Sequence, residues 1–153
     1  MTFLEDFQNF IEEKLLESGI IEPHALIFAD KGCTVINLKE VISTEKDRIL
    51  VLNRIAEIVH ENKAHKVLFV TEVTYYATDE KVNIDLLTIN ECKKQLPEQE
   101  AYQIIEITKD KITTVLRDIH RVSNTIQLGE IIPQGTIINH VYNNIQNNLT
   151  VLN

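Results

Sequence analysis

The spacing of apolar residues changes along the chain and divides it into helical and strand-like segments. In the stretch FLEDFQNFIEEKLLES, apolar positions recur every three or four residues, which is the pattern of a helix with one buried face. Thr2 and Glu5 have the spacing of a capping box at its start, and Gly19 is a typical residue after a helix end. The pattern therefore predicts a helix from about Phe3 to Ser18.

A second helical pattern follows Ser43 and Thr44, either of which is a suitable N-cap. Apolar residues continue from Ile49 to Val59 and cover more than a narrow stripe. This width predicts a helix packed on a sheet and contacted from the side as well.

The remaining segments read as strands. HALIFADKGCTVINL has two short apolar runs around a turn at Asp30 and Gly32, which predicts a hairpin. Further strand-like runs lie near Val67–Tyr76, Val82–Ile89, Ala101–Thr108, Lys111–Arg117 and Thr125–Glu130. The connections ATDEK and KD are too short for parallel crossovers, so we expect antiparallel neighbours.

After Pro133 the chain carries a last apolar stripe among asparagines, which predicts a C-terminal helix at about 136–149. Because asparagine is a weak helix former, packing must hold this helix, either on its own domain or on a partner. The candidate interface residues are Ile137, Ile138, Val141, Tyr142 and Ile145.

These elements predict one α+β domain over residues 1–153, with a five- to six-stranded, mainly antiparallel sheet, two helices of the N-terminal half packed on it and a C-terminal helix. A net charge of -8 argues against nucleic-acid binding, which needs a basic surface. The N-terminus lacks the basic region of a secretory signal, and no apolar run reaches the roughly 18 residues that span a bilayer. With only two cysteines, we expect a cytoplasmic protein with free thiols and no membrane association.

Four charged residues interrupt the strand-like runs and form the candidate site. If the register brings them to one face of the sheet, burial and mutual proximity would shift their pKa values, as in functional sites. The alternative is structural ion pairing, for example between Glu72 and Arg117. The candidate cluster is Glu72, Asp85, Glu106 and Arg117, and the candidate pocket aromatics are Tyr75 and Tyr76.

A metal-dependent nuclease would pair Asp85 with a Glu-x-Lys motif in a later strand. Here the sequence from Glu106 to Lys109 is EITK, so Lys109 stands one residue too far and should face the other side of the strand. The histidines lack the spacing of metal ligands, and no glycine-rich phosphate loop is present. We therefore expect neither metal nor cofactor.

The segments PHALIFADKG, VINL, STEKDR, KVLFVTEV, EAYQIIEITKDKITTVLRDIHR and IQLGE cover most of the chain. Together they resemble a group of small bacterial proteins known only as hypothetical. The resemblance implies a shared hairpin, helix and strand ending in a glutamate and an aromatic, and it favours a cytoplasmic bacterial or phage protein. It brings no activity with it.

Three functional hypotheses follow. The leading one is a non-enzymatic accessory module that binds a macromolecule, with a protein partner or a second copy as the occupant of its interface. The second is a metal-dependent hydrolase or nuclease using Asp85 and Glu106. The third is a small-ligand domain with a pocket near Glu72, Tyr76 and Arg117.

Overall fold

The computed structural model describes residues 2–39, 45–76, 94, 96–132 and 142–151. The predicted α+β class is confirmed. The elements, in chain order, are α1 (Phe3–Ser18), β1 (His24–Ala29), β2 (Gly32–Asn37), α2 (Glu45–Asn62), β3 (Lys66–Tyr76), β4 (Glu98–Thr108), β5 (Ile112–Val122), β6 (Thr125–Ile132) and α4 (Asn143–Asn148). The strand predicted at Val82–Ile89 and the N-cap predicted at Ser43 or Thr44 lie outside the described residues.

All the strands belong to a 6-stranded sheet with the order β2-β1-β3-β4-β5-β6. Each neighbouring pair is antiparallel, and for β4 and β5 this confirms the prediction made from the short connection KD. The connection ATDEK lies outside the described residues. The β5–β6 hairpin turns at Ser123 and Asn124, whose φ angles of 47° and 66° are both positive. This geometry matches the right-handed twist of the flanking strands, and asparagine tolerates it well.

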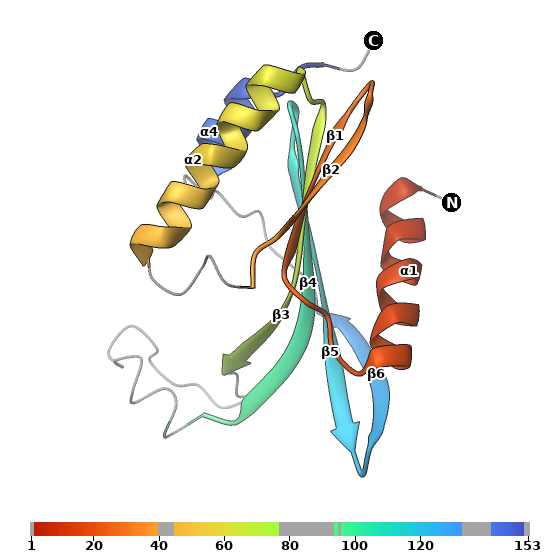
Figure 1. The fold of residues 1–153 in the computed structure, drawn as a ribbon. Helices are drawn as coiled ribbons and strands as arrows, with labels where there is room; N and C mark the ends of the chain where they lie inside the picture. Colours follow the sequence, from red (N-terminus) through yellow and green to blue (C-terminus); the bar gives the residue numbers. More distant parts are fainter. Residues whose placement is uncertain (1, 40–44, 77–93, 95, 133–141, 152–153) are drawn as a thin grey trace.

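The helices lie on opposite faces of the sheet: α1 on one, and α2 with α4 on the other (Figure 1). We call these the α1 face and the α2 face. Central strands β3 and β4 are therefore covered on both sides, and Val67 and Leu68, which point in opposite directions, are each 0% exposed. Burial on both faces explains why β3 begins as a continuous apolar run.

The ends of α1 form as the sequence predicts. Thr2 Oγ1 accepts the N–H of Glu5, and the Glu5 carboxylate accepts the N–H of Thr2. Gly19 adopts a left-handed conformation with φ 82° and donates its N–H to the carbonyl of Leu15. Both caps fix where α1 begins and ends relative to the sheet.

The described part of the tail packs on its own domain. Ile145 and Leu149 are buried in the core of the α2 face. Thr150 then donates its N–H to the carbonyl of Ala64 at 2.9 Å. The other candidate interface residues of the stripe, Ile137, Ile138 and Val141, lie outside the described residues. Among the helices that the structure describes, none is long and apolar enough to cross a membrane.

Candidate functional site

Three of the four charged candidates share the α1 face. Glu72 in β3 is opposite Tyr102 in β4, which is in turn opposite Arg117 in β5. Glu106 is opposite Leu68, four positions from Glu72 along the strands, or about 13 Å at the rise of an extended chain. Sharing a face therefore does not bring the carboxylates together. Asp85 lies outside the described residues.

Glu72 is held by a different partner from the one its face suggested. Its Oε1 accepts a hydrogen bond from Arg121 at 2.9 Å and another from the backbone N–H of Ile21 at 2.9 Å. The same arginine also donates to Glu100 at 2.8 Å and to the carbonyl of Gly19. Glu72 thus joins the loop after α1 to the sheet, and Arg117 is not its partner.

Arg117 instead forms a polar network with α1. It donates to Glu12 at 2.6 Å, and the Tyr102 hydroxyl donates to the same carboxylate oxygen at 2.6 Å. The Gln8 amide donates to the Tyr102 hydroxyl oxygen at 2.9 Å. We call Gln8, Glu12, Tyr102 and Arg117 the α1-face network. Burial raises the pKa of Tyr102 well above its usual value, and the bond to Glu12 adds to this shift.

The sequence contains a signal for this network, namely polar residues beside the apolar face of α1, which the spacing of apolar residues alone does not reveal. Gln8 and Glu12 are one helical turn apart and flank the buried Ile11, so their side chains border the apolar face of α1. Tyr102 is in phase with Glu106 along β4. Polar residues beside an apolar stripe are candidates for buried hydrogen bonds.

Glu106 does not form a nuclease motif with Lys109. Its carboxylate lies 3.3 Å from Lys66 Nζ on the α1 face, and the same ammonium lies 4.3 Å from the centre of the Phe3 ring. Lys109 donates to the carbonyl of Asn147 in α4, on the other side of the sheet. Within the described ranges no three His, Cys, Asp or Glu side chains gather as metal ligands would.

The candidate aromatics also lie apart from Glu72. Tyr75 points to the α2 face, where its hydroxyl donates to Asp118, and desolvation together with this bond raises its pKa to about 12. Tyr76 ends β3 opposite Glu98. Glu72, Tyr76 and Arg117 are not among the described residues that line the cavity discussed next.

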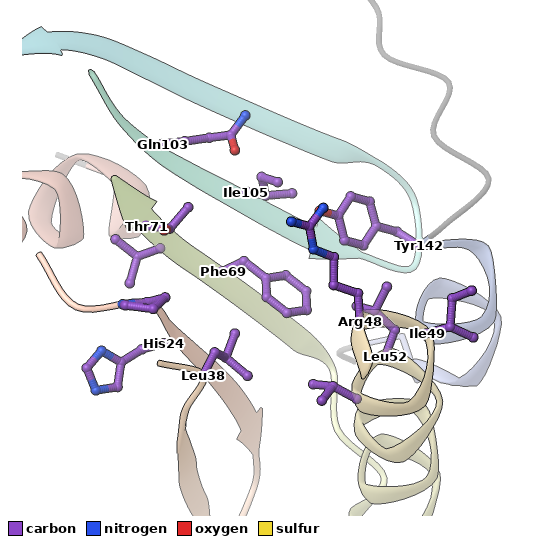
Figure 2. Close-up of a pocket in the computed structure, with 13 residues that line it drawn as sticks. His24, Leu38, Arg48, Ile49, Leu52, Phe69, Thr71, Gln103, Ile105 and Tyr142 are labelled. Carbon is purple, nitrogen blue, oxygen red and sulfur yellow. The ribbon is translucent and has the colours of Figure 1, made fainter. Parts of the chain in front are cut away.

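A cavity of about 450 Å³ lies on the α2 face, between the first half of α2 and the sheet. We call it the α2-face pocket, and Figure 2 shows its lining. Residues from three parts of the chain line the space: Arg48, Ile49 and Leu52 from α2, Phe69, Thr71, Gln103 and Ile105 from the sheet, and Tyr142 before α4.

The position of this pocket follows from how α2 packs. Further along the helix, Ile55, Ala56 and Val59 are buried against the sheet. Near its start, Ile49 is 53% exposed and Leu52 only half-buried, so the layer is less tightly filled there. Space opens over the sheet at this end of the helix.

Few polar groups border the pocket. Thr71 already donates its hydroxyl hydrogen to the carbonyl of Glu72, and His24 Nδ1 lies 2.8 Å from the carbonyl of Glu22. The Tyr142 ring packs against Phe69 with 5.5 Å between ring centres. Burial raises the pKa of Tyr142, so its phenol stays neutral. The arrangement suits binding of an apolar body with a small number of polar contacts.

This pocket was not predicted from the sequence. Of its lining residues only Tyr142 was a candidate, and then as part of an interface stripe. The others lie far apart in the sequence, and each one reads as an ordinary core or helix-surface position. No family model matches the chain, and the comparisons with curated proteins and with solved structures also find no match. The resemblance to small bacterial proteins stays a prediction.

Proposed function

We propose that this protein is a non-enzymatic binding module that takes up a small, largely apolar molecule in the α2-face pocket. The observation that carries the proposal is the cavity itself. Its volume of about 450 Å³ falls within the roughly 300–1,000 Å³ typical of ligand sites. Its walls are mostly aliphatic and aromatic, with polar groups at a few points, which is the composition of a site that binds by burial of apolar surface.

The state of the charged side chains supports binding over catalysis. A general acid, a general base or a metal site needs side chains that can contact the substrate or the metal. Here Glu72, Glu106 and Arg117 are each engaged with protein partners. The hydrolase alternative would need Asp85 beside Glu106, and Asp85 lies outside the described residues.

The macromolecule-binding alternative draws on the lack of a catalytic motif, on the acidic charge and on the tail stripe, and only the stripe names residues for the interface. Of that stripe, Ile145 is 0% exposed and Tyr142 packs against Phe69, so these two side chains are occupied within the chain. This favours the pocket over the stripe as the binding site. We keep the cytoplasm as the proposed location, with which the free thiol of Cys33 is consistent.

Fluorescence titration with 1-N-phenylnaphthylamine, a neutral probe that brightens in apolar sites, tests the proposal. We expect the wild type to bind the probe and Leu52→Phe, which fills part of the pocket, to bind it about tenfold more weakly. Leu50→Phe is the matched control, because Leu50 is on the same helix and 57% exposed. Equal binding by wild type and Leu52→Phe, or none by either, would overturn the proposal.

A further inference from the structure

The charge of the α2-face pocket differs from that of the chain as a whole. The protein has 23 acidic and 15 basic residues, so a typical stretch of its surface carries negative charge. The described residues that line the pocket include no Asp or Glu, whereas Arg48 and His24 are among them. Within an acidic protein, this lining is suited to a negatively charged group.

Arg48 is the basic group best placed to meet a ligand. It lies in the first turn of α2, and Figure 2 shows its side chain extending from the helix toward Tyr142 and the strands. In the part of the chain that the structure describes, Arg48 has no ion pair or side-chain hydrogen bond. By contrast, Arg54 on the same helix donates to Glu57 at 2.8 Å and lies 3.7 Å from Glu61.

We infer that the pocket binds an amphipathic carboxylate, with its apolar body among Leu52, Phe69 and Ile105 and its carboxylate at the Arg48 guanidinium. This inference rests on the proposed function. A guanidinium matches a carboxylate through two parallel N–H bonds. Phosphate groups carry more charge and are usually met by several donors, whereas only one arginine borders the pocket among the described residues.

Tyr142 is consistent with this assignment. Burial raises the pKa of its phenol, so it adds no negative charge beside Arg48 and keeps a hydrogen to donate. The volume sets the size of the ligand. A cavity of about 450 Å³ lies within the roughly 300–1,000 Å³ typical of small-molecule sites, which suits a ligand of modest size. Decanoate is a probe of suitable size.

The test measures how decanoate and 1-decanol displace 1-N-phenylnaphthylamine from the wild type, Arg48→Gln and Arg54→Gln. The two alkyl chains are the same, so the comparison isolates the head group. We expect decanoate to bind the wild type about tenfold more tightly than decanol does. Arg48→Gln should bring decanoate to the level of decanol and leave decanol unchanged. Arg54→Gln removes the same charge from the outer side of α2 and should behave as the wild type does.

Two outcomes would overturn the inference and leave the binding module intact: equal affinity of decanoate and decanol for the wild type, or equal weakening of both by Arg48→Gln. An equal loss of decanoate binding in Arg54→Gln would also overturn it, because the effect would then come from net charge alone. Failure of the neutral probe to bind the pocket is a different result, since it contradicts the proposed function itself. Salt gives an independent readout: added sodium chloride should weaken decanoate binding to the wild type and not to Arg48→Gln.

Discussion

Both faces of the sheet hold their helices through an apolar core, and the α1 face adds a polar network to that core. On the α1 face, long polar side chains of α1 reach the strands, and Glu12 meets Arg117 and Tyr102 in a closed set of hydrogen bonds. On the α2 face, the contact is made by aliphatic residues such as Ile55 and Val59, and it loosens toward the start of α2. The cavity described above lies on the α2 face, where the described contacts between helix and sheet are mainly apolar.

This difference shows where function can be sought in such a fold. Charged residues on a sheet draw attention as catalytic candidates, yet each carboxylate and guanidinium of the α1-face network is satisfied by another protein group. A buried group that is fully hydrogen-bonded fixes structure and offers little to a ligand. In the α2-face pocket, Arg48 and an apolar wall can contact a ligand, so we expect binding on the α2 face.

Among substitutions that test the difference between the two faces, we expect Arg117→Leu to change the free energy of unfolding most. It leaves the Glu12 carboxylate, whose side chain is only 14% exposed, without its cationic partner. We expect a loss of about 2 kcal/mol in the free energy of unfolding, at the low end for a buried pair because both partners keep some water contact. Urea denaturation measures it. Adding Glu12→Gln to Arg117→Leu should recover part of this loss, since no unpaired charge then remains; an unchanged midpoint in the single variant would contradict the network.

The next effect separates the buried Tyr102 from the partly buried Tyr142. Tyr102→Phe removes a hydroxyl that donates to Glu12 and accepts from Gln8, and should lower the stability by about 1.5 kcal/mol. Tyr142→Phe is the control from the α2 face, because in the described part of the chain its hydroxyl makes no hydrogen bond. It should change the stability by less than about 0.5 kcal/mol. Equal losses in thermal or urea unfolding would remove the contrast between the faces.

Alkaline pH should weaken the same contact. The pKa of Tyr102 is raised above its ordinary value of 10.0 in the folded protein, so above about pH 10 the unfolded chain releases a proton that the folded one retains. The free energy of unfolding must then fall as the pH rises, and Tyr102→Phe should show a shallower fall. Tyr75, with a pKa of about 12, contributes in the same direction and remains in that variant. Parallel pH profiles for the two proteins would show that Tyr102 titrates normally.

The order of the elements was predictable from the sequence, because each element carries its own period and its own turn or cap. The capping box of Thr2 and Glu5 and the hairpin of β1 and β2 form as expected. The placing of α1 and α2 on opposite faces could not be predicted in this way. A strand that is apolar on both sides, as β3 is from Val67 to Val70, does not indicate which helix covers which face.

For the charged candidates, the shared face was predictable from the sequence, but their partners were not. Strand parity places Glu72, Glu106 and Arg117 on one face, and they do lie there. The alternation of side chains along a strand does not show which residue a charged side chain pairs with. That choice depends on the residues that lie between the charged groups in the sheet and on the polar side chains of the covering helix. Tyr102 stands between Glu72 and Arg117, and α1 supplies Glu12. The pocket was still harder to predict, because it arises from incomplete packing among residues that each read as an ordinary core or helix-surface position.

A smaller effect, of opposite sign, is expected when the pocket is filled. Leu52→Phe adds apolar volume to existing space and should raise the stability by about 0.5 to 1 kcal/mol, while Leu50→Phe at an exposed site should leave it unchanged. The melting temperature of the unliganded protein measures this. A loss of stability in Leu52→Phe would show that the space is narrower than the structure indicates.

The smallest effect is expected at Glu72, the carboxylate that first suggested a site. Its side chain is 29% exposed, and Glu72→Gln keeps an oxygen that can accept the N–H of Ile21 while losing the charge that faces Arg121. We expect a loss of about 0.5 kcal/mol, as for a partly solvated ion pair. Glu100→Gln, which weakens the other pair of the same arginine, should give a similar or smaller loss in urea denaturation. Neither substitution should change the affinity for decanoate, because Glu72 and Glu100 both contact Arg121 and lie outside the pocket lining. A loss of decanoate binding in Glu72→Gln alone would instead make the α1 face part of the binding site.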